Sequence, residues 1–296
     1  MNAGGAPGLL AALALLALWY VARWWSIERA RQATGDTRPG VLDLLTGFVT
    51  NFFDTLGIGS FAPTTAIFRL RARMPDENIP GTLNVGHALP TITEAFIFIA
   101  IVTVDFATLA GMIAASIAGA WLGAGMVARL PRRAVQLGMG VALLVAATLF
   151  LAANLEWTPA GGEALGLTGG TLAFAIAANF ALGALMTLGI GLYAPCLILV
   201  SLLGLNPIAA FPIMMGSCAF LMPVGGLRFV RAGRYDLRAA LGLVFGGIPA
   251  VLLAAFVVKS LPLVWLRWLV VVVVLYTSVA MLAAALRKAP AAVAAL

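Results

Sequence analysis

The chain has 296 residues, of which 62% are hydrophobic and 10% are charged, and its formal net charge is +7. Soluble domains carry roughly a quarter charged residues, so this composition excludes an ordinary soluble protein and indicates a surface that faces lipid. The positive charge does not indicate nucleic-acid binding, because the basic residues lie in short gaps between apolar runs, where Lys and Arg hold loops on the cytoplasmic side of a membrane.

The first half of the chain contains apolar runs long enough to cross a hydrocarbon core of about 30 Å. No positive charge precedes Arg23, which favours a first spanning helix with its N-terminus outside over a cleaved signal peptide. We expect spanning helices at 9–25, 81–104, 106–128 and 134–153. Between the first two, the apolar stretch 41–70 is interrupted by the sequence Gly-Ile-Gly-Ser-Phe-Ala-Pro at 57–63.

The second half repeats this plan after a polar, glycine-rich linker at 154–170. Its apolar stretch 171–205 is interrupted by Gly-Ile-Gly-Leu-Tyr-Ala-Pro at 189–195. Further spanning helices are expected at 207–225, 239–258 and 262–286.

Three sequence anchors relate the two halves. Thr-Leu-Gly-Ile-Gly occurs at 55–59 and again at 187–191, an offset of 132 residues. Segments that begin at Gly86 and Gly216 form a second pair, and the Leu-Pro pairs at 130 and 261 form a third, at offsets of 130 and 131. Chance rarely gives three anchors at nearly one offset, so the sequence predicts an internal duplication.

Loop charge predicts how the halves are oriented. The arginine clusters all lie on the cytoplasmic side if each interrupted segment is a re-entrant hairpin that leaves by the side it entered. The linker, which has Glu156 and Glu163 and no Lys or Arg, is then outside, and the two halves are inverted. If the interrupted segments instead crossed the membrane fully, the cluster Arg69–Arg73 would be external, against the positive-inside bias.

The interrupted segments are the candidate site. Non-helical backbone at membrane depth survives only where protein or water replaces its hydrogen bonds. Gly57, Gly59, Gly189 and Gly191 permit tight turns, and the prolines that follow can open half-helices whose positive ends point at the membrane midplane. Two such ends, brought together by inverted symmetry, predict an anion site. The alternative is that the glycines only let helices pack closely.

Side chains near the two breaks supply candidate substrate-binding groups. Hydroxyl or thiol groups that could donate to a small oxyanion belong to Thr55, Ser60, Thr64, Thr187, Tyr193 and Cys196. The same groups could instead cap a half-helix. Further candidates for lining the same cavity are Asn51, Asn84 and Asn179.

The ionisable residues near the breaks belong to the first half. Asp54 stands beside the first break, and His87, the only histidine, shares a helix face with Thr91 and Glu94. Their counterparts in the second half are Met186, Ser217, Leu221 and Val224. Intramembrane ionisable residues indicate function by default, so Asp54, His87 and Glu94 are predicted to couple protons to transport. The alternative is a packed, hydrogen-bonded His and Glu.

The sequence predicts no catalytic centre, no metal site and no cofactor. The segment Gly57–Gly59 lacks the following glycine and the strand–helix context of a dinucleotide site. The sequence also lacks a P-loop lysine and the Cys and His spacing of a metal site.

The interrupted segments, together with the short segments 84–90 and 212–218 after them, resemble the sulfite exporter TauE/SafE family, also called the 4-toluene sulfonate uptake permease family. The resemblance covers the chain beyond the first helix. The family more often has a further glycine where this chain has Ser60 and Leu192, which narrows the loop. Membership implies movement of sulfite, sulfonates or related sulfur-containing organic anions across the inner membrane.

We therefore predict an all-α polytopic membrane protein made of two inverted repeats, each a broken re-entrant helical hairpin plus three spanning helices, with one extra N-terminal helix. The parts are the N-terminal helix and cytoplasmic loop (1–40), the first repeat (41–153), the external linker (154–170) and the second repeat (171–296).

The predicted function is a secondary transporter of a small sulfur-containing anion in a bacterial-type inner membrane, working by alternating access, with the proton as the candidate coupling ion and the C-terminus cytoplasmic. Two alternatives stay open: an uncoupled anion channel, and thiosulfate or sulfur uptake through the thiols of Cys196 and Cys218. The expected partners are the small anion and the lipid bilayer, with no nucleic acid, and a homodimer is one compatible assembly.

Overall fold

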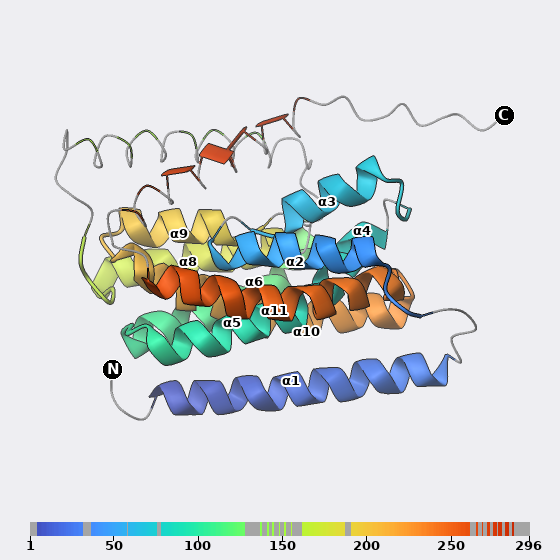
Figure 1. Cartoon of the computed structure of the whole chain (residues 1–296). Helices are drawn as coiled ribbons and strands as arrows, with labels where there is room; N and C mark the ends of the chain where they lie inside the picture. The colour runs from blue at the N-terminus through green and yellow to red at the C-terminus, as the bar shows by residue number, and fades with distance from the viewer. Residues whose placement is uncertain are drawn as a thin grey trace.

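The structure is a computed structural model. It describes residues 5–31, 37–57, 59–75, 78–127, 162–186 and 191–260, together with isolated positions within 137–155 and 265–286. The helices are α1 (Gly5–Ala30), α2 (Val41–Thr55), α3 (Phe61–Leu70), α4 (Ile79–Gly86), α5 (Ala88–Ile101), α6 (Phe106–Val127), α8 (Gly169–Met186), α9 (Tyr193–Leu202), α10 (Pro207–Ala232) and α11 (Leu237–Ser260). Most of them run side by side in one bundle, with α1 along one flank (Figure 1). The predicted all-α class is confirmed for the part of the chain described.

Five stretches are long and apolar enough to cross a membrane: Gly5–Ala30, Ile79–Ile101, Gly169–Met186, Pro207–Ala232 and Leu237–Val257. All but Gly169–Met186 match predicted spanning helices; that one lies in the segment predicted as the first arm of a hairpin. Helix α6 coincides with the span predicted at 106–128, and its part Phe106–Leu122 is a shorter apolar helix. The spans predicted at 134–153 and 262–286 lie almost wholly outside the described residues.

The span Ile79–Ile101 consists of two helices, α4 and α5, which meet at His87. The sequence predicted a single helix through this residue. Pro90 gives the physical reason for the break, since it has no N–H with which to bond the carbonyl of Gly86. The carbonyl of His87 still accepts the N–H of Thr91 at 2.9 Å, so helical bonding resumes directly after the break.

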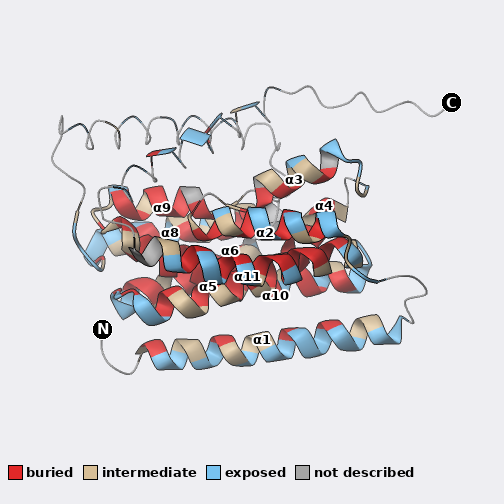
Figure 2. Cartoon of the chain, in the orientation of Figure 1, coloured by how far each residue is buried: buried red, intermediate tan, exposed pale blue. Residues whose placement is uncertain are grey.

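The most buried of these five stretches is α10, which packs on α1, α4, α5, α6 and α9. Figure 2 shows this buried interior, with the outward surface of α1 exposed. The buried residues of α1 form one stripe, Ala6, Leu13, Tyr20 and Trp24. Helix α1 packs on the bundle through this stripe, and its remaining apolar residues face lipid.

The two halves of the chain exchange helices. Helix α2 packs mainly on α11, and the equivalent helix of the second half, α8, packs mainly on α6. Small residues allow this close approach. A Cβ atom on Gly47 would lie 2.6 Å from the carbonyl oxygen of Gly242, and Gly183 packs directly against the carbonyl of Ser116. The halves therefore form one interlocked bundle rather than two separate domains.

At one end of the bundle, which we call the Asp236 end, the turn between α10 and α11 meets the start of α2 and the residues after α3. Arg73, which follows α3, contacts both Asp43 in the first turn of α2 and Asp236 in the α10–α11 turn. The end of α1 also lies there, because the indole of Trp24 donates a 2.9 Å hydrogen bond to the hydroxyl of Tyr235. The chain thus leaves α3 at the same end at which it entered α2.

At the other end, the Asp105 end, the residues before α8 meet the residues after α9. The N–H of Ala164 bonds the carbonyl of Gly204 at 3.3 Å, and the N–H of Asp105 bonds the same linker at 2.8 Å. The start of α1 lies at this end as well, since Gly5 packs on the ring of Phe106. The chain thus leaves α9 at the end at which it entered α8, which is opposite to the α2–α3 pair.

Candidate functional site

The first break lies between α2 and α3. Gly57 and Gly59 have φ angles of +92° and +86°, a left-handed conformation that glycine adopts without steric cost. Asp54, in the last turn of α2, accepts two hydrogen bonds from Ser60, one from its backbone N–H at 2.7 Å and one from its hydroxyl at 2.9 Å. Asp54 therefore ties the end of α2 to the start of α3 across the two glycines.

The second break precedes α9, which begins at Tyr193. The predicted site residues Thr187 and Gly189 lie outside the described residues. Leu192 is the N-cap of α9 and its side chain offers no acceptor, so no side chain at this position caps the first-turn N–H groups. Cys196 is buried one turn further along α9.

Glu94 of α5 connects the two breaks. Its carboxylate accepts a hydrogen bond from the hydroxyl of Thr55, the last residue of α2, at 2.8 Å. It accepts a second from the hydroxyl of Tyr193 at 2.6 Å. The side chain is fully buried, so these two hydroxyls replace the water that a carboxylate would otherwise bind.

His87 lies behind the first break and is fully buried. Its Nδ1 is 2.9 Å from Oδ1 of Asn51, and its Nε2 is 3.1 Å from the hydroxyl of Thr64. The amide nitrogen of Asn51 donates to the carbonyl of Gly47 at 2.7 Å, which leaves its oxygen to face the ring. We therefore assign the proton of the neutral imidazole to Nδ1, with Nε2 accepting from Thr64.

A small cavity lies between the two breaks. Its polar lining residues are Asp54, Ser60, Thr91 and Tyr193. The other lining residues are Gly59, Phe61, Met186, Gly191, Leu192, Cys218 and Met222. No lysine or arginine is among these described lining residues. The cavity thus has a polar side with a buried carboxylate and a side rich in apolar and sulfur-containing groups.

Equivalent residues of the two halves line this cavity together. Four pairs, each 132 residues apart, are Asp54 with Met186, Gly59 with Gly191, Ser60 with Leu192 and Phe61 with Tyr193. The duplicated segments therefore face one common space. Their chemistry differs, because an acid and a hydroxyl of the first half stand opposite a thioether and an alkyl chain of the second.

Most of the predicted site residues come together in this region. Those that line the cavity are Asp54, Gly59, Ser60, Gly191 and Tyr193. Those that lie behind the lining in hydrogen bonds are Thr55, Glu94, Thr64 and His87. Gly57 instead faces the Met214 side chain, and neither Gly57 nor Cys196 is among the lining residues.

The three asparagines proposed for the cavity lie elsewhere. Asn51 holds His87, and Asn84 donates to the carbonyl of Pro80 within its own helix at 2.9 Å. Asn179 donates to the carbonyl of Met112 at 2.7 Å and to the hydroxyl of Ser217 at 3.0 Å. The interpretation of these residues as cavity lining is therefore wrong for the cavity that the described residues form.

Sequence reasoning missed most of the apolar side of the cavity, formed by Phe61, Met186, Cys218 and Met222. The repeat contained a usable signal for two of them, because Met186 is the counterpart of Asp54 and Phe61 is the counterpart of Tyr193. Met222 follows Cys218 by four residues and so shares its helix face. The sulfur of Cys218 lies 3.5 Å from that of Met186, which joins the two helices at this wall.

The long apolar helices and the cavity enclosed by two interrupted segments define a multi-pass membrane protein. Residues 5–150 match the family model described as Sulfite exporter TauE/SafE. This match confirms the resemblance that the motifs predicted, to a family of transporters rather than enzymes. No curated protein and no solved structure matches the chain.

Proposed function

We propose that this protein is a secondary transporter that moves sulfite, a sulfonate or a related small sulfur-containing organic anion across a bacterial-type inner membrane by alternating access. The observation that carries the proposal is the cavity between the two breaks, which equivalent residues of both halves line. Transporters built from inverted repeats bind their substrates at discontinuous helices near the interface of the repeats.

The positions of the loops support two inverted repeats. The α2–α3 pair opens to the Asp236 end, whereas the α8–α9 pair opens to the Asp105 end. Arginines from several loops meet at the Asp236 end, where Arg31 donates to the carbonyl of Arg231 and Arg238 to that of Arg38, both at 3.0 Å. The positive-inside bias makes this end cytoplasmic and puts the N-terminus and the linker outside.

Helix N-termini supply the donors for an anion. Both α3 and α9 begin with residues that line the cavity, Phe61 and Tyr193. The first-turn N–H groups of such helices, together with the positive end of the helix dipole, favour negative charge. The hydroxyls of Ser60 and Thr91 add neutral donors on the polar side of the cavity.

The buried carboxyl groups determine when an anion can enter. Asp54 lines the cavity, and Glu94 is one hydrogen bond behind Tyr193. Two ionised carboxylates in a medium of low dielectric would repel an anion, and the described lining provides no cationic side chain to offset them. Anion binding is therefore favoured when one of these groups carries a proton, which supports proton-coupled transport through Asp54 or Glu94.

His87 fits a positioning role in this scheme. Both ring nitrogens already have partners, Asn51 and Thr64, and the ring is outside the cavity lining. It therefore holds the first turns of α3 against α2 and α5, while proton exchange with the substrate belongs to the carboxyl groups nearer the cavity.

The test is flux into proteoliposomes that contain the purified protein and an entrapped pH indicator. Sulfite, sulfoacetate, taurine, thiosulfate and sulfate are added one at a time, with and without a pH gradient. The proposal expects one of the sulfonates or sulfite to move together with protons and to accumulate against its gradient. The proposal would be contradicted if the purified protein transported none of these anions and none of them raised its melting temperature in a thermal-shift assay.

One observation favours a second candidate, uptake of thiosulfate or sulfur through thiols. Cys218 lines the cavity and lies beside Met186, although Cys196 does not reach the lining. Thiosulfate flux that survives in the double variant Cys196→Ser, Cys218→Ser removes this candidate. The other alternative, an uncoupled anion channel, is excluded if the anion accumulates against its gradient and a protonophore abolishes this accumulation.

A further inference from the structure

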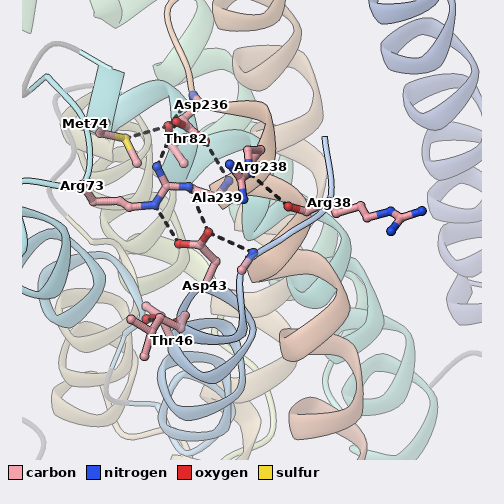
Figure 3. A network of polar contacts seen from close by, with 11 residues as sticks. Arg38, Asp43, Thr46, Arg73, Met74, Thr82, Asp236, Arg238 and Ala239 are labelled. Carbon is pink, nitrogen blue, oxygen red and sulfur yellow. Dashed lines mark hydrogen bonds and ion pairs between the residues drawn. The ribbon is translucent and has the colours of Figure 1, made fainter. Parts of the chain in front are cut away.

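Arg73 is the centre of a polar cluster at the Asp236 end. Its guanidinium makes a two-pronged contact with Asp43, with Nε 3.0 Å from Oδ1 and Nη2 2.9 Å from Oδ2. Its remaining nitrogen, Nη1, lies 3.3 Å from Oδ2 of Asp236. Figure 3 shows Arg73 lying between the two acids. Paired prongs of this kind are among the stronger ion-pair geometries, and Asp43 is almost fully buried.

The backbone is strained to bring Arg73 to this position. Ala72 has a φ of +46° and is the only described residue other than glycine with positive φ. The N–H of Arg73 bonds the carbonyl of Phe68 at 2.9 Å, which closes α3 with a Schellman-type turn whose left-handed position is usually glycine. A left-handed alanine is unfavourable, so the contacts made by Arg73 offset the cost of this turn.

The cluster joins the two halves of the chain at one end of α3. The other end of α3 is at the cavity, where Phe61 is a lining residue. Asp236 belongs to the second half, where its carboxylate accepts the N–H of Ala239 at 2.8 Å. Its own N–H bonds the hydroxyl of Thr82, in α4 of the first half, at 2.9 Å. Helix α3 therefore runs from the cavity to an ion pair with the opposite half.

The opposite end of the bundle is closed in a different way. Asp105, which stands 131 residues before Asp236, caps α6 through the N–H of Thr108 at 2.9 Å, as Asp236 caps α11. The position equivalent to Arg73 is Leu205, whose N–H bonds the carbonyl of Val200 and so closes α9 as Arg73 closes α3. Gly204, the counterpart of Ala72, bonds the linker through its backbone carbonyl. Equivalent places in the repeat thus carry an ion pair at the Asp236 end and backbone hydrogen bonds at the Asp105 end.

We propose that the ion pairs of Arg73 with Asp43 and Asp236 form the latch of the gate at the Asp236 end, which holds α3 against the second half and keeps the cavity closed on that side. The inference rests on the alternating access of the proposed function. Opening toward the Asp236 end requires α3 and the residues after it to separate from the α10–α11 turn, which breaks the contact with Asp236. The Asp105 end opens without breaking any of these ion pairs.

The native cysteines provide the reporter for a test. Cys218 lines the cavity and is 1% exposed, and Cys196→Ser removes the other cysteine of the chain. In this background, a membrane-impermeant thiol reagent is applied to the outside or loaded into the lumen of oriented proteoliposomes. The labelling rate of Cys218 is then compared among Arg73→Gln, Asp236→Asn and the control Arg71→Gln. Asn keeps the capping acceptor of position 236, and Arg71 is an exposed arginine of the same turn.

We expect Arg73→Gln and Asp236→Asn each to raise the labelling rate from the Asp236 side by about fivefold or more, the factor typical of a coupling between two states. The double variant should add little to Arg73→Gln, because Arg73→Gln already removes the ion pair with Asp236. Arg71→Gln should label at the parent rate, and labelling from the Asp105 side should not rise in any variant. The assay needs no substrate, so it is independent of which anion is transported.

Two results overturn the latch. Unchanged labelling from the Asp236 side in Arg73→Gln, while the parent protein still transports, removes the latch and leaves the transporter in place. An equal rise from both sides shows general loosening rather than a gate, and a melting temperature well below that of Arg71→Gln would accompany it. Rapid labelling of the parent from both sides at once would instead remove alternating access itself.

Discussion

The hydroxyl of Tyr193 donates a 2.6 Å hydrogen bond to the carboxylate of Glu94, which stands 99 residues earlier in the chain. This contact joins the start of α9 in the second half to α5 in the first, directly behind the cavity. Because a buried acceptor that loses its donor keeps the cost of desolvation, Tyr193→Phe should lower the free energy of unfolding by about 1–3 kcal/mol. Tyr20→Phe, which removes a longer 3.3 Å bond to the carbonyl of Val85, is the matched control and should cost less. Denaturant titration in detergent measures both.

Glu94→Gln separates binding of the anion from its coupling to protons. The amide keeps the size of the side chain and one acceptor oxygen for Thr55 or Tyr193, but it cannot exchange a proton. We expect accumulation driven by a pH gradient to be lost, while exchange of labelled for unlabelled anion across the membrane continues. Asp54→Asn is compared in the same assay. If both variants accumulate the anion as the parent does, neither carboxyl group carries the coupled proton.

The carboxylate of Asp54 has a structural task that can be measured apart from transport. It accepts both donors of Ser60 across the first break. Asp54→Ala removes both acceptors and should destabilise the protein by about 2–3 kcal/mol, whereas Asp54→Asn keeps one acceptor oxygen and should cost less. Ser60→Ala removes only the hydroxyl bond and should lie between Asp54→Asn and the parent. Equal melting temperatures for Asp54→Ala and the parent would contradict this ordering.

The glycines of the first break should be sensitive for a backbone reason. A Cβ on Gly57 would meet the Met214 side chain only at ordinary contact distance, 3.6 Å, so space does not forbid an alanine there. The φ of +92° at this position is unfavourable for alanine, so Gly57→Ala should lower the free energy of unfolding by about 1–2 kcal/mol. Gly170→Ala in the first turn of α8, where nothing lies within 4 Å of the added atom, is the control and should be neutral or stabilising.

The sequence predicts the local features of this protein well. Hydropathy places most of the described spanning helices, and the two Gly-Ile-Gly motifs locate the breaks, because glycine and proline act on the backbone within a few residues. The proximity of Asp54 and Ser60 to the first break follows from the same short-range rules. The long apolar run predicts one continuous helix through His87, whereas the structure has a break there, for which Pro90 is the local signal.

Contacts between the halves could not be predicted in this way. The bond from Tyr193 to Glu94 and the ion pairs of Arg73 depend on how helices far apart in sequence dock. The arginines after α3 carry a topological signal in the sequence, and only the fold shows that one of them meets acids from both halves. The sequence does not predict the apolar side of the cavity either, because a methionine such as Met222 in a membrane helix is typical of core packing.

Ala72→Gly tests the strain in the turn that precedes Arg73. Glycine adopts the left-handed conformation of this position freely, so the substitution should stabilise the protein by about 1 kcal/mol despite the greater freedom of glycine in the unfolded chain. The gain should be visible as a higher melting temperature in detergent. A lower melting temperature would show that the turn is not strained. The Arg73 ion pairs would then have no backbone cost to offset.

Met222 tests whether the cavity lies on the path of the anion. Its side chain forms part of the apolar wall of the small cavity between the two breaks. Met222→Leu conserves volume and should leave transport close to that of the parent, whereas Met222→Trp fills the cavity. Because a bulky sulfonate needs more of this space than sulfite does, Met222→Trp should abolish toluene sulfonate flux first and reduce sulfite flux less. Parental transport of both anions by Met222→Trp, in protein that melts as the Leu variant does, would show that the substrate passes elsewhere.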